Sequence, residues 1–306
     1  MGKELIKPAG LRPGDTIGIA APASPFDKES FKEGIRIIES LGFNVKTPEN
    51  IFRRNGYLAG SDMERSESLM RLFEDDSIHG IFCARGGFGS MKLLPLLDFR
   101  IISKNPKIFV GFSDITALSL AIYQHSGMAT FHGPLVTTLG KGSEATIAAL
   151  KTAISSSTPL VLTPSKPIVL RPGKTSGPVI GGNLTVLTHL LGTPYEPSFD
   201  GHILFLEDRG EAPYRIDRLL SQFRLAGHLD GISGLILGTF HDCGNPEEIY
   251  NIVAEALKDT QIPILAGFDL GHGPENLTIP LGLRAKLDTE NGNLQFQEPA
   301  IKEATP

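Results

Sequence analysis

Cysteine, charge of one sign and long apolar runs are all scarce in this sequence, and each scarcity excludes a class of protein. The 306 residues include only two cysteines, Cys83 and Cys243, and neither belongs to a C-x-x-C pair. A disulfide framework or a zinc site built on thiolates is therefore not expected. The formal net charge of -5 gives no electrostatic attraction to nucleic acid or to a membrane surface, so we expect neither partner.

Membrane-spanning and metal-binding patterns are missing as well. No stretch reaches the roughly 18 apolar residues that a membrane-spanning helix needs, and the first residues, MGKELIKPAGLRPGD, lack the apolar core of a signal peptide. The histidines include no H-x-x-x-H pair, which argues against a histidine-rich metal site. The sequence therefore predicts a soluble cytoplasmic protein that needs no metal and no cofactor.

In the first half of the chain, short apolar runs alternate with helical patterns. Residues 15–22, 80–84 and 107–112 are expected strands, and the last two are apolar throughout, as strands covered on both faces should be. Amphipathic helices are expected at 31–42 and 61–76. This alternation predicts an α/β fold with a parallel sheet between helices, of the flavodoxin or Rossmann type.

Composition changes between Ser155 and Pro178, where five prolines stand among Ser, Thr and Lys without helical periodicity. Such a stretch is typical of a connector between domains. We therefore expect an N-terminal domain over residues 1–150, a linker over 151–177 and a C-terminal domain over 178–306.

The C-terminal domain is expected to be α/β with a β-barrel-like sheet. Its predicted elements are a helix over 181–192 with Asn183 as N-cap, a strand over 202–208, a helix over 214–227 and a strand over 234–240. Residues 276–297 alternate in polarity in the manner of a hairpin, with Glu-Asn-Gly at the turn.

The most informative segment is KIFVGFSDIT, residues 107–116. An apolar strand runs into the tetrapeptide GFSD, and a helical pattern follows at once. A nucleophilic serine needs this placement, because a sharp turn exposes the hydroxyl and a helix N-terminus stabilises developing negative charge. Ser113 or Asp114 could instead serve only as helix caps, and Ile115 stands where a G-x-S-x-G pattern has its second glycine.

A second loop, ARGGFGS at residues 84–90, also joins a strand to a helical pattern. Consecutive glycines allow backbone N–H groups to converge on an anion, either a phosphate or a tetrahedral oxyanion. The spacing matches neither G-x-G-x-x-G nor the P-loop. A purely structural tight turn is an equal alternative.

Carboxylates and histidines supply the remaining candidates. Glu207 and Asp208 end an expected strand, at the sheet edge where α/β proteins present side chains to a crevice, although acids at strand ends are usually solvated. His132 and His272 lie in Gly/Pro turns after apolar runs, where functional residues are common. Spacing alone does not choose between the two histidines.

Taken in order, these segments resemble the LD-carboxypeptidase family, which includes the microcin-immunity peptidases. The motifs that carry the resemblance span nearly the whole chain: LRPGDTIGIAAPAS, CARGGFGS, PKIFVGFSDITAL, FHGP, GGNLTVL, LEDRGEAPYRIDRLLSQ and GHGPENLTIPLG. Each motif is modest, but so many in the right order are hard to obtain by chance.

The resemblance implies a Ser-Glu-His catalytic triad. The GFSD match assigns the nucleophile to Ser113, the LED match assigns the acid to Glu207, and the GHG match assigns the base to His272. His132 then has a structural role near the site. The implied reaction passes through an acyl-enzyme and cleaves the L,D-peptide bond before a C-terminal D-alanine in murein tetrapeptides.

The resemblance also implies an oxyanion hole formed by the backbone N–H groups of Gly87 and Asp114. An exopeptidase must in addition hold the free carboxylate of its substrate. Arg85, beside Gly86, is the candidate for this contact, and a structural pairing of Arg85 is the alternative. The family favours a homodimer that takes part in cell-wall recycling.

Two rival functions remain open on the sequence. The same triad could hydrolyse a peptidyl-nucleotide antibiotic of the microcin type, because the pocket side chains that separate the two substrates are not placed by sequence. The glycine loops could alternatively belong to a nucleotide-binding α/β protein without hydrolytic activity.

Overall fold

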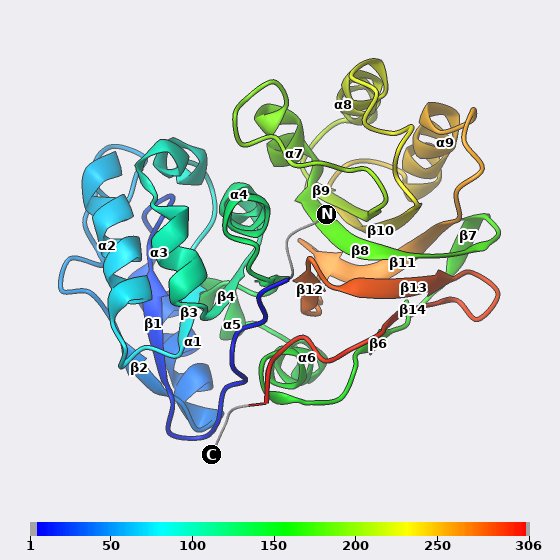
Figure 1. The fold of residues 1–306 in the computed structure, drawn as a ribbon. Helices are drawn as coiled ribbons and strands as arrows, with labels where there is room; N and C mark the ends of the chain where they lie inside the picture. The colour runs from blue at the N-terminus through cyan, green and yellow to red at the C-terminus, as the bar shows by residue number, and fades with distance from the viewer. Residues whose placement is uncertain (1–4, 304–306) are drawn as a thin grey trace.

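The computed structural model describes residues 5–303, so the outermost positions of both expected domains lie outside the described residues. Two β-sheets with flanking helices lie side by side (Figure 1). The first is built almost entirely from the N-terminal half of the chain and the second from the C-terminal half.

The first sheet has the strand order β12-β5-β4-β3-β1-β2. Its strands are β1 (Thr16–Ala20), β2 (Asn44–Lys46), β3 (Gly80–Cys83), β4 (Ile108–Gly111), β5 (Thr130–His132) and β12 (Ile279–Leu281). Strands β1 to β5 are parallel, and their order 2-1-3-4-5 is that of flavodoxin-like folds. Strand β12 joins the edge antiparallel to β5.

Helices cover both faces of this sheet, which explains the continuous apolar runs of its strands. The helical elements are α1 (Lys28–Ser40), α2 (Asp62–Glu74), η1 (Ser90–Leu96), α3 (Phe99–Lys104), η2 (Ser113–Ile115), α4 (Thr116–Ser126), α5 (Val136–Leu139) and α6 (Glu144–Ser155). Along β3, Ile81 packs into the core that contains α2, α3 and α4, whereas its neighbour Phe82 packs into the core that contains α1, α5 and α6. The predicted parallel α/β architecture is confirmed.

The second sheet has the strand order β6-β14-β13-β8-β9-β10-β11-β7. Its strands are β6 (Val161–Leu162), β7 (Ile168–Arg171), β8 (Lys174–Asn183), β9 (Ile203–Arg209), β10 (Gly234–His241), β11 (Ile264–Gly271), β13 (Arg284–Asp288) and β14 (Asn293–Phe296). Strands β8 to β11 are parallel, and the outer strands pair antiparallel.

Three helices, α7 (Leu184–Leu190), α8 (Pro213–Leu225) and α9 (Pro246–Ala256), cover one face of the second sheet (Figure 1). On the other face, Phe205 of β9 and Leu265 of β11 share one buried cluster with Leu287 of β13 and Phe296 of β14. The sheet therefore curls so that its own strands bury each other's apolar side chains. This second mixed sheet agrees with the predicted C-terminal α/β architecture.

The stretch expected to be a linker contributes two strands to the second sheet. Strand β6 pairs with β14 and strand β7 pairs with β11. The predicted hairpin near the end of the chain is formed by β13 and β14, whereas β12, which the same pattern included, pairs with the first sheet. The boundaries at 150 and 178 stay a prediction.

The two sheets are joined by direct contacts of α4 with α7 and β8. The backbone N–H of Asn183 donates to Oγ1 of Thr116 at 3.2 Å, and a Cβ at Gly182 would lie 2.6 Å from the same oxygen. Because only glycine allows this approach, the start of α7 is held against the start of α4. Within residues 5–303, no helix has both the length and the apolar character needed to cross a bilayer.

Candidate active site

Ser113 lies at the carboxyl end of β4, in a turn with a left-handed backbone. Its φ is 64°, a conformation that few residues other than glycine adopt and that often marks a functional site. The short helix η2 starts at Ser113 and runs directly into α4. The side chain is therefore presented at the tip of a strand-turn-helix unit, as a nucleophile requires.

Glycines on either side create the space for this turn. A Cβ at Gly111 would lie 2.7 Å from Cγ2 of Ile115, so the missing side chain at Gly111 admits the branched side chain that departs from the G-x-S-x-G pattern. A Cβ at Gly86 would lie 2.9 Å from Cβ of Ser113 and 3.3 Å from the backbone nitrogen of Asp114. The glycine loop after β3 and the turn after β4 are thus in direct contact.

The Asp114 side chain fixes the two loops to each other. Its carboxylate accepts the backbone N–H of Ser90 at 2.8 Å, and the Ser90 hydroxyl donates to the carbonyl oxygen of Asp114. Burial raises the pKa of the Asp114 carboxyl above its usual value. The backbone N–H of Asp114 is therefore held beside Gly86, next to Gly87, with which the family resemblance implies an oxyanion hole.

Glu207 and His272 form a buried acid-imidazole pair at the carboxyl ends of β9 and β11. Nδ1 of His272 lies 2.7 Å from Oε2 of Glu207, and the backbone N–H of His272 donates to the same oxygen at 3.2 Å. Glu207 is fully buried, whereas the His272 side chain is 13% exposed. The expectation that acids at this strand end are solvated is wrong, because both Glu207 and Asp208 are buried.

Asn183 joins the carboxylates in a way the sequence did not indicate. It caps α7, accepting the N–H of Val186 at 3.1 Å, as predicted. Its Nδ2 also donates to Oε1 of Glu207 at 3.3 Å and to Oδ1 of Asp208 at 3.0 Å. Asp208 in turn accepts the backbone N–H and the hydroxyl of Thr185. The signal for this network was the polar residue after two glycines at a strand end.

The turn around His272 is held by Gly271 and Asn276. Gly271 has a φ of 103°, and a Cβ there would overlap Oε2 of Glu207 and lie 2.7 Å from its Cγ. Oδ1 of Asn276 accepts the N–H of Gly271 at 2.8 Å. The imidazole is therefore held by the backbone on one side and by the carboxylate on the other.

The structure separates the two candidate histidines. His132 ends β5, is 1% exposed and has no hydrogen-bond partner at Nε2 in the described chain. Burial lowers the pKa of its imidazole to about 4, so the ring is neutral near pH 7. Phe112 lies against both rings, at 5.6 Å from the His132 centroid and 4.8 Å from the His272 centroid.

Ser113 and His272 line the same cavity, of about 720 Å³, between the two sheets. Arg85, Gly86 and Gly87 also line it, whereas Glu207 lies behind His272. His132 is not among the lining residues. The cavity thus brings together hydroxyl, imidazole and glycine loop from strand ends far apart in the sequence, which suits acyl transfer.

Arg85 makes a structural contact, the alternative considered for it, and it also lines the cavity. Its Nη1 donates to the carbonyl oxygen of Pro25 at 2.6 Å, and its side chain lines the cavity. The neighbouring Ser24 hydroxyl accepts the N–H of Phe88 at 3.1 Å. The loop after β1 therefore supports the glycine loop from behind.

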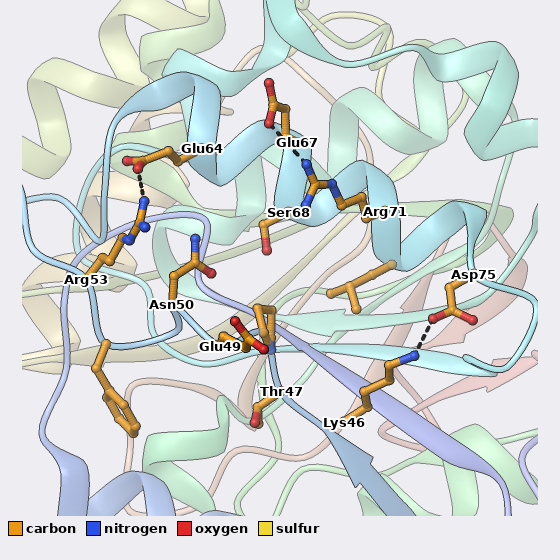
Figure 2. Close-up of a pocket in the computed structure, with 13 residues that line it drawn as sticks. Lys46, Thr47, Glu49, Asn50, Arg53, Glu64, Glu67, Ser68, Arg71 and Asp75 are labelled. Atoms are coloured by element: carbon orange, nitrogen blue, oxygen red, sulfur yellow. Dashed lines mark hydrogen bonds and ion pairs between the residues drawn. The ribbon is translucent and has the colours of Figure 1, made fainter.

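A larger cavity, of about 920 Å³, lies elsewhere, between the end of β2 and helix α2 (Figure 2). Six of its seven charged side chains pair with one another: Lys46 with Asp75, Arg53 with Glu64, and Arg71 with Glu67. None of the predicted site residues lines it. Across residues 5–303, no group of three or more His, Cys, Asp or Glu is arranged to hold a metal ion.

Comparison with known proteins matches both halves of the chain. Residues 17–133 match the LD-carboxypeptidase N-terminal domain, and residues 176–287 match the LD-carboxypeptidase C-terminal domain. A probable murein peptide carboxypeptidase from Bacillus subtilis is 38% identical, over 92% of each chain. A murein tetrapeptide carboxypeptidase from Pseudomonas aeruginosa is 31% identical, over 89% of this chain and 92% of that one.

The fold is shared with solved structures. The structure of MccF in complex with glutamyl sulfamoyl guanosine superposes with a TM-score of 0.90 and 29% identity, over 97% of this chain and 99% of that one. Fold, cavity and relatives together define a peptidase of the carboxypeptidase type. The chain belongs to the LD-carboxypeptidase family, and the resemblance predicted from its ordered motifs is confirmed.

Proposed function

We propose that this protein is a serine-type LD-carboxypeptidase that cleaves the L,D-peptide bond before a C-terminal D-alanine in murein tetrapeptides. The observation that carries the proposal is the 2.7 Å Glu207–His272 pair in a cavity shared with Ser113 and the glycine loop. The names of the relatives from Bacillus subtilis and Pseudomonas aeruginosa agree with it.

Acylation begins at the Ser113 hydroxyl. The Glu207 carboxylate accepts the proton on Nδ1 of His272, so Nε2 carries the lone pair that takes the proton from Oγ of Ser113. Oγ forms a bond to the scissile carbonyl carbon, and the carbonyl oxygen becomes an oxyanion. The backbone N–H groups of Gly87 and Asp114 donate hydrogen bonds to this oxyanion. Each bond stabilises the transition state by roughly 3 kcal/mol, by analogy with deleted oxyanion donors.

Collapse of the tetrahedral intermediate breaks the C–N bond. The proton on Nε2 of His272 passes to the leaving nitrogen, and D-alanine departs with its amine and carboxylate complete. Water then loses a proton to His272 and attacks the acyl-enzyme ester, which restores the Ser113 hydroxyl and releases the shortened peptide. Arg85 adjoins Gly86 and holds the terminal carboxylate of the substrate, with Gly86 leaving room for it.

On the basis of the proposed substrate, we propose that the protein acts in the cytoplasm, where peptides released from the cell wall return for recycling. We propose a homodimer as the active form, on the resemblance to the family. Analytical ultracentrifugation tests this point independently of activity.

A microcin-type peptidyl-nucleotide hydrolase is the second candidate, favoured by the TM-score of 0.90 with MccF. The same triad would cleave the peptidyl-nucleotide, and only the leaving group would differ from that of the murein peptide. The decisive experiment compares release of D-alanine from a murein tetrapeptide with release of the nucleoside from an aminoacyl sulfamoyl adenosine. A kcat/KM at least tenfold higher for the tetrapeptide supports the proposal, and the reverse ratio contradicts it.

Serine-type chemistry is tested separately with a fluorophosphonate. The probe should label wild-type protein at Ser113 and leave Ser113→Ala unlabelled. Labelling at another residue, or full activity in labelled protein, would contradict the assignment of Ser113 as the nucleophile. Saturable stabilisation by nucleotides without any turnover would instead point to a nucleotide-binding protein.

A further inference from the structure

The cavity that contains Ser113 and His272 has a one-sided charge. Three cationic side chains line it, those of Arg85, Lys141 and Arg209, and no Asp or Glu is among its lining residues. Glu207, which pairs with the lining residue His272, is fully buried. A cleft of this kind attracts anionic ligands and disfavours cationic ones.

Of the three cations, Lys141 differs from the others in having no partner among residues 5–303. Arg85 donates to the carbonyl oxygen of Pro25 at 2.6 Å, and Nε of Arg209 lies 3.9 Å from Oδ2 of Asp242. No hydrogen bond or ion pair joins the Lys141 amine to any residue in the part of the chain that the structure describes. An exposed ammonium on a flexible stem can follow a carboxylate that is not rigidly placed.

The backbone around Lys141 is nevertheless well held. Its N–H donates to the carbonyl oxygen of Thr138 at 3.2 Å, and Thr137 ties helix α5 to Ala84, at the start of the glycine loop. Among the described residues the Lys141 ammonium thus has no partner, whereas the backbone that carries it is held by a hydrogen bond. This separates it from a solvated surface lysine on a helix.

The same cavity is lined by a second donor group, the side-chain amide of Asn276. Asn276 lines the cavity and is 7% exposed, and its Nδ2 has no hydrogen-bond partner among the described residues. Its backbone N–H donates to Oγ1 of Thr146 at 3.1 Å, which joins it to the segment that follows Lys141. An ammonium and an amide that line the same cavity are donors that a carboxylate can accept.

We propose that Lys141 is a specificity-determining residue that binds a carboxylate on the acyl side of the scissile bond. The inference rests on the proposed carboxypeptidase function. The terminal carboxylate is attached to the carbon that bears the leaving nitrogen, so its partner must adjoin Ser113. Arg85 meets that condition through Gly86, so Lys141, which lines the same cavity with Thr146 and Asn276, is left for a carboxylate on the other side of the scissile bond.

A murein tetrapeptide can offer two carboxylates on the acyl side. One is the side-chain carboxylate of diaminopimelate as third residue, and the other is the free α-carboxylate of the γ-linked D-glutamate. Four synthetic peptides distinguish them: the parent with both groups, one with lysine as third residue, one with the glutamate amidated, and one with both changes.

The experiment measures kcat/KM for D-alanine release from all four peptides by wild type and Lys141→Met. Lys151→Met is the control, since Lys151 is exposed on α6, outside the cavity. We expect Lys141→Met to lower kcat/KM on the parent peptide on the order of tenfold, mainly through KM. On the peptide that lacks the relevant carboxylate, wild type and Lys141→Met should become equal. The control should match wild type on every peptide.

Equal losses by Lys141→Met on all four peptides, or no loss on any, would overturn the inference. Dissociation constants of the same peptides are measured in a Ser113→Ala background with and without Lys141→Met. If wild type releases no D-alanine but this binding coupling is present, the proposed function fails and the carboxylate site stands. If D-alanine is released but the binding coupling is absent, the proposed function stands and the carboxylate site fails. If neither D-alanine release nor coupling is observed, the proposed function and the carboxylate site both fail.

Discussion

Oε2 of Glu207 accepts two hydrogen bonds from one residue, the side-chain Nδ1 of His272 at 2.7 Å and its backbone N–H at 3.2 Å. This double contact fixes both the position and the tautomer of the imidazole. Oε1 of the same carboxylate is held by Nδ2 of Asn183. The pair is therefore preorganised before any substrate binds.

Replacement of Glu207 by Gln tests that relationship. A neutral amide cannot stabilise the imidazolium, and its NH₂ group can face Nδ1 and favour the wrong tautomer. We expect kcat to fall on the order of 10³- to 10⁴-fold while the protein remains folded. Steady-state D-alanine release, with circular dichroism as the folding check, measures it; near-normal turnover would remove Glu207 from the mechanism.

The nucleophile and the base are expected to act as one unit. Ser113→Ala and His272→Ala should each lower kcat on the order of 10⁵-fold or more, and the double variant should be hardly worse than either. No side chain of residues 5–303 caps η2, so if Ser113 has only a structural role in the turn, its loss should change stability by about 1 kcal/mol and leave turnover intact. Additive losses in the double variant would show that the two residues do not share a step.

Gly271→Ala should disable the site although it replaces none of the three triad side chains. The new Cβ would collide with the Glu207 carboxylate, and the φ of 103° is unfavourable for alanine. We expect kcat to fall on the order of 10²-fold or more, with a stability loss of about 2 kcal/mol. Gly192→Ala is the matched control: its φ is 74° and nothing lies within 4 Å of its Cβ position. It should lose only about 1 kcal/mol of stability and keep full activity.

His132 should govern pH stability rather than turnover. Its folded pKa of about 4 lies below the ordinary 6.5 because of burial, so the unfolded chain binds the extra proton first. Stability should therefore fall as the pH drops from 6.5 to 4 and level off below 4, by roughly 3 kcal/mol from this residue. Glu207 and His272 are the ionisable groups that face it.

The measurement compares wild type with His132→Phe by urea unfolding between pH 4 and 7.5. The difference between their unfolding free energies isolates His132 from other titrating groups, and it should shrink or reverse towards pH 4. D-alanine release by His132→Phe should stay within about tenfold of wild type at pH 7. A dead His132 variant beside an active His272→Ala would show that the base has been assigned to the wrong histidine.

Limited proteolysis tests the domain boundary. Residues 156–159 and 165–167 are half-buried or exposed and join α6, β6 and β7, so we expect the first cuts there. Mass spectrometry of early fragments identifies the sites. Early cuts inside 80–130 would place the boundary elsewhere.

The fold was largely predictable because its signals are local. The apolar runs of β3 and β4 are continuous, since each strand is covered by helices on both faces, and helix patterns follow them directly. The placement of Ser113 between strand and helix was readable for the same reason. The order of motifs supplied the rest.

What the sequence could not predict depends on contacts between distant segments. The burial of Glu207 results from Asn183 and His272, which reach it from two other strand ends. The turn with positive φ at Ser113 lies against Gly86 of the preceding strand-end loop, a contact that its local sequence does not encode. Strand β12 looked like part of a hairpin because alternation sets a strand's faces and not its partner.

Strand β12 also determines when the molecule becomes competent during its synthesis. Ile279 pairs with His132, and Leu281 pairs with Thr130, so the edge of the sheet that carries Ser113 is supplied by a segment that is synthesised long after β5. A ribosome that has translated the first half has produced a serine turn beside an unpaired edge strand. Hydrolytic activity should thus emerge only after β12 has been synthesised.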